Sequence, residues 1–363
     1  MMLKDNTAVS YARAWALFLV SYAVFFGITL FMGKFIEADW DIRLLLFMNP
    51  DHYVPILDQL VIFQTDWGAF YMGLLTIAWL VGYYASRSSA EAQTRTKYVY
   101  YVLAVLFGLW YGAGMFVQKK GIFWWGKAEY TSVFLLLGLV LFGGLMMIGT
   151  LFTRLSDDDQ RKITQACWLV LLCVFFVNAV GEDTIKALIK RPRPLHEANN
   201  AWNGAIRVLP DEVVKGSYSY ISGHTSSFWA QTVVFFWLIK SWRIRIPLLA
   251  LGIFHGYTRI YTTAHFPYCV IMATFFGFGV SSMVYYCFWN HRHLPLLAML
   301  SVGASLLMVA KASQRPVALG VIVISLVWFA VWHLINRGNA PAPAVSDALY
   351  PFGEPEKRKK ISA

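Results

Sequence analysis

Three short stretches of the sequence combine basic residues with histidine in a way that suits phosphoryl transfer. Lys186, Arg193 and Arg259 can neutralise the oxygens of a phosphoryl group. His224 and His265 can supply a nucleophile and a proton donor. The three stretches read KALIKRPRP (residues 186–194), SGHTSSF (222–228) and YTRIYTTAHFPYC (257–269). Together they predict a site for a phosphate monoester or a pyrophosphate.

The first two stretches also contain signals for the ends of helices. Lys186 and Arg193 are seven positions apart, so one continuous helix would direct both side chains to the same side. Proline at positions 192 and 194 then ends that helix and sends the chain outward. In the second stretch, Gly223 permits close backbone approach, and Ser222 heads a Ser/Thr run that can cap the next helix. The free N–H groups at such a helix start favour an anion.

The elements that carry these stretches are predicted to be membrane-spanning helices. Of the 363 residues, 58% are hydrophobic, 17% are aromatic and only 14% are charged. The apolar residues come in blocks of about 18–23, the length with which a helix crosses a bilayer core of roughly 30 Å. The fold class is therefore all-α, a polytopic transmembrane helical bundle of about ten spans. The predicted spans are 12–33, 67–85, 98–117, 131–152, 163–185, 225–241, 246–263, 267–289, 295–311 and 317–336.

Basic residues mark one side of this bundle as cytoplasmic. Lys and Arg are concentrated in the connections that follow the even-numbered spans and in the Lys357–Lys360 tail. This distribution puts both termini in the cytoplasm and all three chemical stretches on the outer face. We expect residues 1–336 to form a single transmembrane domain and residues 337–363 to form a flexible cytoplasmic tail. Residues 34–66 mix acidic, aromatic and apolar types, which predicts an interfacial segment.

Charge and cysteine content exclude several classes of protein. The net charge is +11, but its distribution fits the positive-inside rule and anionic lipid better than it fits nucleic acid. The four cysteines form no CxxC pair and no His/Cys cluster with zinc spacing. On the predicted outer face, no carboxylate cluster suits Mg²⁺. The sequence therefore predicts no metal and no cofactor, with membrane lipids and a lipid phosphate substrate as partners.

Taken together, the motifs Lys-x6-Arg-Pro, Ser-Gly-His and Arg-x5-His resemble the signature of the type 2 phosphatidic acid phosphatase superfamily, the membrane lipid phosphate phosphatases. Here they run from Lys186 to Pro194, from Ser222 to His224 and from Arg259 to His265. The resemblance covers residues 163–289. It implies a six-helix, lipid phosphatase-like core, to which the first two spans and residues 34–66 contribute. Spans three, four, nine and ten are then additions.

The resemblance also implies a metal-independent mechanism with a covalent intermediate. His265 would attack phosphorus and become a phosphohistidine. His224 would protonate the leaving group and then activate the water of the second step. The groups that would bind the phosphoryl oxygens are Lys186, Arg193, Arg259, Ser222 and the N–H of Gly223.

One departure from the family pattern concerns the nucleophile. The family continues His-x3-Asp, where the Asp orients the imidazole and stabilises its positive charge, but Cys269 stands at this position. A neutral thiol is a weak hydrogen-bond partner, and a thiolate would serve better. Glu182 or Asp183 is the alternative orienting carboxylate, although either can equally pair with Lys186. The remaining options are a weakened or inactive site and an engineered change.

The sequence thus predicts a membrane enzyme that hydrolyses or transfers a lipid phosphomonoester or pyrophosphate at the outer leaflet. We expect a multi-pass protein of a bacterial inner membrane with its site on the periplasmic face. The alternative is a catalytically impaired protein that binds or transports a lipid phosphate. Cys269 favours this alternative, and the retained pair His224 and His265 opposes it. A soluble vanadate haloperoxidase shares the phosphate-site pattern and is disfavoured by the predicted spans.

Overall fold

The computed structural model describes residues 11–35, 38–49, 52, 54–87, 89–118, 131–196, 205–207, 218–291, 293–309, 323 and 327. All secondary-structure elements of this described part are helical, which confirms the prediction of an all-α bundle. The predicted tail, residues 337–363, and nearly all of the span 317–336 lie outside the described residues. The division into one transmembrane domain and a tail therefore stays a prediction.

The first nine predicted spans each coincide with a helix. The fifth is a continuous rod in which a π-helical segment, η2, separates two α-helical parts. The elements are α1 (Tyr11–Met32), α2 (Ala38–Met48), α3 (Pro55–Ser86), α4 (Ala90–Gln118), α5 (Thr131–Arg154), α6 (Asp157–Val174), η2 (Phe175–Glu182), α7 (Asp183–Ile189), α9 (Gly223–Leu238), α10 (Trp242–Tyr261), α11 (Pro267–Phe288) and α12 (Leu294–Val309).

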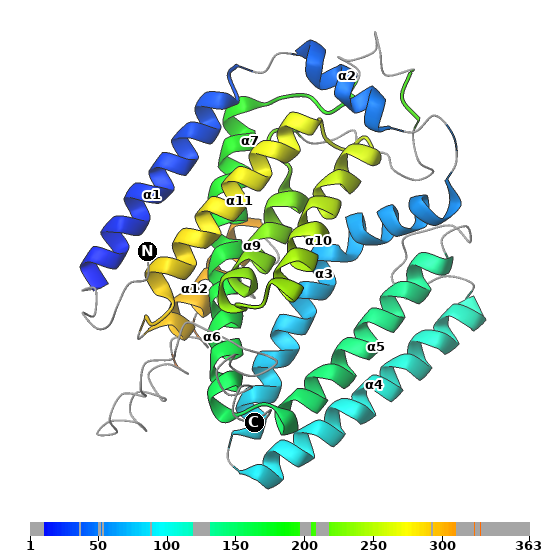
Figure 1. Cartoon of the computed structure of the whole chain (residues 1–363), viewed down its shortest axis with the longest axis vertical. Helices are drawn as coiled ribbons and strands as arrows, with labels where there is room; N and C mark the ends of the chain where they lie inside the picture. Colours follow the sequence, from blue (N-terminus) through cyan, green and yellow to red (C-terminus); the bar gives the residue numbers. More distant parts are fainter. Residues whose placement is uncertain are drawn as a thin grey trace, which may run out of the picture.

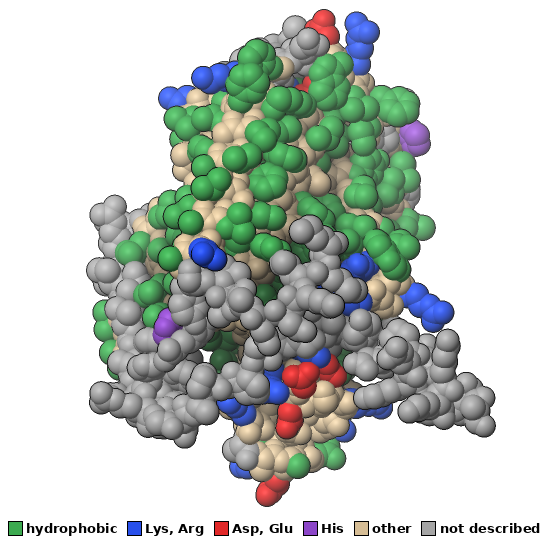
Figure 2. All heavy atoms as spheres, turned by 60° about the vertical axis from the view of Figure 1, so that its left-hand side comes forward, with side chains coloured by type: hydrophobic (Ala, Val, Ile, Leu, Met, Phe, Trp, Pro, Cys, Tyr) green, Lys and Arg blue, Asp and Glu red, His purple; other side chains and the backbone are tan. Residues whose placement is uncertain are grey.

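Five stretches of the described chain are long and apolar enough to cross a membrane. Figure 2 shows hydrophobic side chains over a broad surface, with charged side chains gathered toward its upper and lower ends. Water-soluble monomers rarely expose so much contiguous apolar surface, whereas a lipid-facing surface requires it. The five stretches are Ala12–Met32, Ile56–Ser86, Leu135–Arg154, Asp157–Ile189 and Pro267–Phe288.

The core of the bundle forms around α9 and α11, which pack closely against each other. A Cβ atom at Gly277 of α11 would lie 2.9 Å from the carbonyl oxygen of Ser226, so this approach requires glycine. Helices α6 and α10 pack on α9, while α1 covers α11 and α12 packs on α6. The pair α4 and α5 packs on α3 and stands apart from α9 and α11 (Figure 1). This arrangement fits the expectation that the third and fourth spans are additions to a core.

Helix α3 begins at Pro55, well before the predicted start of the second span. Proline is tolerated in the first turn of a helix, where its missing N–H has no helical partner. The polar residues that made this stretch resemble an interfacial segment face the protein interior instead. Asp58, Gln64 and Thr65 are buried, and each has a hydrogen-bond partner on another element. Tertiary pairing therefore extends a helix that composition alone would have started later.

Helix α7 ends at Ile189, three residues before Pro192, so one helix does not carry both Lys186 and Arg193. Lys190 closes the helix in a left-handed conformation with a φ angle of 54°. A proline disfavours helical geometry in the residue before it, so the chain leaves the helix before the prolines. The expectation of one continuous helix through both cations is therefore wrong.

Candidate active site

Several segments that are distant in sequence meet at one end of the bundle, the upper end in Figure 1. They are the end of α7, the segment before α9, the start of α9 and the turn between α10 and α11. Backbone hydrogen bonds connect them. The N–H of Ser222 donates to the carbonyl of Cys269 at 3.3 Å, and the N–H of Ser219 donates to the carbonyl of Arg191 at 2.8 Å. The structure thus brings the three chemical stretches together.

His265 lies in the turn between α10 and α11, and it is fully buried. Its backbone N–H donates to the carbonyl of Arg259 at 3.0 Å. Its ring nitrogen Nδ1 lies 2.7 Å from the carbonyl oxygen of Ser219. Because a carbonyl oxygen only accepts, Nδ1 carries the proton and donates it. The other nitrogen, Nε2, then holds the lone pair of the neutral ring, and it faces Nη1 of Arg193 at 3.3 Å.

The surroundings of His265 keep its ring neutral. Burial lowers the pKa of His265 well below its usual value of 6.5, because a buried imidazolium loses its hydration. Nearby positive charges lower this pKa further, whereas the hydrogen bond to the carbonyl of Ser219 raises it. At neutral pH the lone pair on Nε2 is therefore available. The charges belong to Arg193, Arg259 and Lys186.

Arg193 and Arg259 are both buried and are held by groups on different elements. Arg193 donates from Nη1 to the carbonyl of Ala264 at 2.9 Å, which places it beside the histidine that follows. Arg259 donates from Nη1 to the hydroxyl of Thr65 on α3 at 3.2 Å. That hydroxyl in turn donates to the hydroxyl of Thr258 at 2.6 Å. Helix α3 thus fixes one of the cations of the site.

Lys186 forms an ion pair with Glu182, one helical turn earlier on the same rod. The carboxylate of Glu182 also lies against Gly223, where any Cβ atom would collide with it. Within the described structure, neither Glu182 nor its neighbour Asp183, which is exposed, makes a hydrogen bond to His265. Of the two roles considered for these carboxylates, Glu182 therefore has the one that pairs with Lys186.

His224 is the second residue of α9, and its side chain is exposed while its backbone is held. Its carbonyl accepts from Nε2 of the buried His255 at 3.1 Å, and Nδ1 of that ring lies 3.2 Å from the amide nitrogen of Gln64. Ser222 caps the helix, since its side chain accepts from the N–H of Thr225 at 3.5 Å. His255 thus has a structural role, and the ring of His224 stays open to a ligand.

Cys269 lies one turn after His265, but in the described structure its thiol makes no hydrogen bond to that ring. The sulfur lies 3.3 Å from the hydroxyl oxygen of Ser219 and accepts from Nη1 of Arg191, also at 3.3 Å. The hydroxyl of Ser219 is 3.4 Å from Nδ1 of His265. The thiol therefore reaches the ring only through Ser219. The carbonyl of Ser219, and not residue 269, is the direct partner of Nδ1.

Comparison with known families agrees with this geometry. Residues 162–293 match the family model described as the PAP2 superfamily. This part of the chain is therefore similar to the PAP2 superfamily. The match confirms the resemblance stated from the motifs, and it contains the whole stretch from Lys186 to Cys269. No curated protein and no solved structure matches the chain.

PAP2 superfamily members act on phosphate esters, so the match supports phosphatase activity in general. Together with the long apolar helices, it identifies a membrane protein. Parts of the chain outside the matched residues also contribute to the site, since Thr65 on α3 binds Arg259. The PAP2 region is therefore completed by helices that precede it in the sequence.

Sequence reasoning missed three groups around His265. Ser219 acts through its backbone carbonyl, which any residue type would provide, so no sequence signal could have found it. Asp41 on α2 forms an ion pair with Arg191 at 2.6 Å. An acidic residue in an otherwise apolar segment, and an additional Arg inside KRPRP, were the available signals for this pair.

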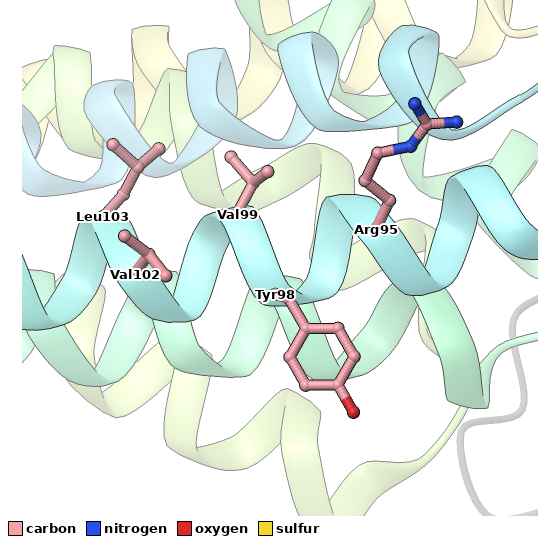
Figure 3. Close-up of a pocket in the computed structure, with 5 residues that line it drawn as sticks. All are labelled: Arg95, Tyr98, Val99, Val102 and Leu103. Atoms are coloured by element: carbon pink, nitrogen blue, oxygen red, sulfur yellow. The ribbon is translucent and has the colours of Figure 1, made fainter.

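Two other features concern the binding of metal ions and of lipid chains. Among the residues that the structure describes, no group of three or more His, Cys, Asp or Glu side chains is placed to hold a metal ion. A shallow groove runs along one face of α4, away from the PAP2 residues (Figure 3). Its lining is mostly apolar and comes from this single helix, which fits contact with lipid chains. The lining residues are Arg95, Tyr98, Val99, Val102 and Leu103.

Proposed function

We propose that this protein is a lipid phosphate phosphatase or phosphotransferase that works through a phosphohistidine. The observation that carries the proposal is the ring of His265. Its Nδ1 donates to the carbonyl of Ser219 at 2.7 Å, which leaves Nε2 as the nucleophilic atom. That atom lies 3.3 Å from a guanidinium nitrogen of Arg193, which is suited to bind an oxygen of the phosphoryl group under attack.

In the first step, Nε2 of His265 forms a bond to phosphorus while the bond from phosphorus to the leaving oxygen breaks. Arg193 exchanges its contact with Nε2 for one with a phosphoryl oxygen. His224 gives a proton to the leaving oxygen, which departs as an alcohol or as a phosphate. The exposure of His224 supports this role, because a proton donor must reach the substrate and must then be protonated again.

In the second step, a water molecule gives a proton to His224 and its oxygen attacks phosphorus, and the bond between phosphorus and Nε2 of His265 breaks. In a phosphotransferase an alcohol takes the place of the water. Throughout both steps the negative charge on the phosphoryl oxygens is balanced by cations and by donors at the start of α9. The cations are Lys186, Arg193 and Arg259. The donors are the N–H of Gly223 and the hydroxyl of Ser222, since the N–H of Ser222 already binds the carbonyl of Cys269.

We further propose that the substrate is a lipid and that the site faces the periplasm of a bacterium. A phosphate held at the end of apolar helices leaves its lipid tail beside their exposed hydrophobic side chains. The basic connections lie at the opposite ends of the predicted spans, which by the positive-inside rule are cytoplasmic.

The test is phosphate release by the purified protein from a panel of lipid phosphates in detergent micelles. The panel contains phosphatidic acid, phosphatidylglycerol phosphate and a polyprenyl pyrophosphate. We expect release by the wild type and none by His265→Ala, because the nucleophile is gone. His52→Ala, which removes an exposed histidine outside the site, is the matched control and should match the wild type.

Labelling of the protein itself tests the intermediate. With a substrate labelled in its phosphoryl group, the wild type should acquire a label that is stable in alkali and lost in acid, and His265→Ala should acquire none. Equal turnover by the wild type and His265→Ala would overturn the proposed mechanism. Tight binding of lipid phosphates without turnover by the wild type would favour the binding or transport alternative.

A further inference from the structure

The direct partner of His265 raises a question about charge. A backbone carbonyl fixes the tautomer of the ring, but it carries no net charge to balance the positive charge that the ring gains during attack. In the family pattern an Asp four residues after the nucleophile serves both purposes, and here Cys269 stands at that position. A carboxylate that balances this charge would have to be buried near the start of α11 and not used by the proposed mechanism.

Asp41 of α2 meets that description. Its side chain is completely buried, and a buried carboxylate is costly unless its oxygens are paired. Both oxygens are used here. Oδ2 lies 2.6 Å from Nη2 of Arg191, and Oδ1 accepts from the N–H of Tyr268 at 2.8 Å. Both partners come from parts of the chain that are distant in sequence, at the edge of the nucleophile's turn.

The first link from Asp41 to His265 runs through the start of α11. This helix has Phe266 at its N-cap, and no side-chain cap comes from the residues that begin it. Asp41 supplies the missing cap from α2, because it binds the N–H of Tyr268, the second residue of α11. A negative charge at a helix start is also favoured by the helix dipole. Asp41 thus fixes the backbone three residues after His265.

The second link runs through Arg191. Its guanidinium is held by Asp41 and stacks on the ring of Phe266 at 3.8 Å from the ring centre. Its carbonyl accepts from the N–H of Ser219 at 2.8 Å. The carbonyl of Ser219 is the direct partner of His265, so Arg191 holds the residue that holds the nucleophile.

We propose that Asp41 is the positioning carboxylate of this site and that it acts on His265 through Arg191 and the start of α11. The identity of residue 269 follows from this arrangement. Nη1 of Arg191 lies 3.3 Å from the sulfur of Cys269, so a carboxylate at position 269 would compete with Asp41 for the same guanidinium. A cysteine avoids that competition. The inference rests on the proposed function, since it assigns a role around the proposed nucleophile.

The test compares the wild type with Asp41→Asn, Cys269→Asp and the double variant, with kcat and KM measured separately on the best lipid phosphate. Asp41→Asn should lower kcat by about 10- to 100-fold, by analogy with the loss found when the group that orients a metal-binding histidine is removed. KM should change little, because Asp41 does not touch the phosphate. Asp39→Asn, which changes an exposed acidic residue on the same helix, should match the wild type.

The double variant separates positioning from a merely structural role. In Asp41→Asn/Cys269→Asp the new carboxylate lies next to Arg191 and next to the turn of the nucleophile. We expect the kcat of the double variant to be at least about tenfold higher than that of Asp41→Asn. Cys269→Asp alone should have a kcat equal to or below that of the wild type, because two carboxylates then share one guanidinium. The double variant also keeps a charged partner for Arg191, so it stays informative if Asp41→Asn folds poorly.

Failure of this inference is distinguishable from failure of the proposed function. If His265→Ala is inactive while Asp41→Asn keeps the kcat of the wild type, the proposed function stands and the positioning role is overturned. The positioning role is also overturned if Asp41→Asn loses activity and thermal stability together and Cys269→Asp restores neither. If His265→Ala retains activity, the proposed function itself fails.

Discussion

The helices α9 and α11, at whose starts His224 and His265 lie, begin in different ways. Helix α9 is capped by its own Ser222, and His224 at its second position is exposed. Helix α11 has no cap from the residues that begin it, and Asp41 of α2 binds its first turn instead. His265, just before α11, is fully buried. One helix start is therefore local and open, and the other is assembled from distant segments and closed.

This difference matches the two tasks that phosphoryl transfer sets. A nucleophile needs a fixed direction and a free lone pair, and the buried ring of His265 has its Nδ1 fixed by the carbonyl of Ser219. A proton donor needs access to the substrate and to water, which the exposed ring of His224 has. In the proposed mechanism, the closed helix start is therefore the site of covalent chemistry and the open one is the site of proton exchange.

The largest expected effect breaks the comparison directly. His224→Ala should lower kcat by about 10²–10⁴-fold, the usual contribution of a positioned proton donor. The loss should shrink for a substrate whose leaving group is a weak base, because such a group departs without protonation. His265→Ala should stay inactive both with the lipid phosphate and with the substrate whose leaving group is a weak base. The same dependence on the leaving group in both variants would remove the distinction between the two rings.

A smaller effect is expected from a methyl group at the open helix start. In Gly223→Ala the new Cβ collides with the carboxylate of Glu182, which must move away from the start of α9 and take Lys186 with it. We expect a loss of about 1–3 kcal/mol in stability, the usual cost of overpacking, and a higher KM, because Lys186, which we propose binds the phosphate, is displaced. Thermal unfolding in detergent and steady-state kinetics measure the two.

Gly73→Ala is the matched control for that substitution. A Cβ atom at Gly73 of α3 meets no other atom within 4 Å, so the same chemical change should leave activity unaltered. If Gly223→Ala behaves like Gly73→Ala, then the contact between Glu182 and the start of α9 has no energetic role.

The smallest expected effect sharpens the closed side of the comparison. The pKa of His265 in the folded protein is below the value of 6.5 that it has when unfolded, mainly because of burial. Between these two pKa values the unfolded chain binds a proton that the folded chain does not. The contribution of the neutral His265 ring to the free energy of unfolding is therefore fully present above pH 6.5. It is lost as the pH falls below that value, by at most about 1.4 kcal/mol per pH unit.

Thermal unfolding in detergent at about pH 7.5 and pH 5.5 measures this contribution. The wild type should lose more stability on acidification than His265→Gln, which has no imidazole at this position. His52→Gln, at an exposed position, should behave like the wild type. Equal losses in the wild type and His265→Gln would mean that His265 becomes protonated without unfolding.

The sequence was sufficient to predict the helices and to predict that the basic and histidine side chains of the candidate site lie together. The reason is physical. Apolar blocks of membrane length identify helices without any tertiary information. The basic residues in alternate connections then predict which ends of the helices share one side of the bundle. This prediction places Lys186, His224 and His265 at the same end, as the structure has them. A basic or histidine residue stands out in a sequence when the residues around it are apolar.

What the sequence did not predict depends on tertiary contacts. The early start of α3 depends on Asp58, whose buried oxygens are paired with Arg207, at 2.8 and 3.0 Å, and with the hydroxyl of Tyr261. The partner of His265 is a backbone atom of Ser219, which has no residue signature. The role of Asp41 depends on a contact with Tyr268 that is 227 positions away. Spacing along the chain carries no information about such pairs.

The π-helical segment η2, between α6 and α7, has a consequence for the direction of Lys186. An α-helix turns by about 100° per residue, whereas a π-helix accommodates more residues in each turn. Phe175 to Glu182 are wound in this wider way. The azimuth of Lys186 and Glu182 around the rod is therefore set by the winding of η2 as well as by their distance from α6. A substitution within η2 that returned it to α-helical winding, with the number of residues unchanged, would rotate both side chains about the helix axis, and the basic site would lose a member with none of its own residues replaced.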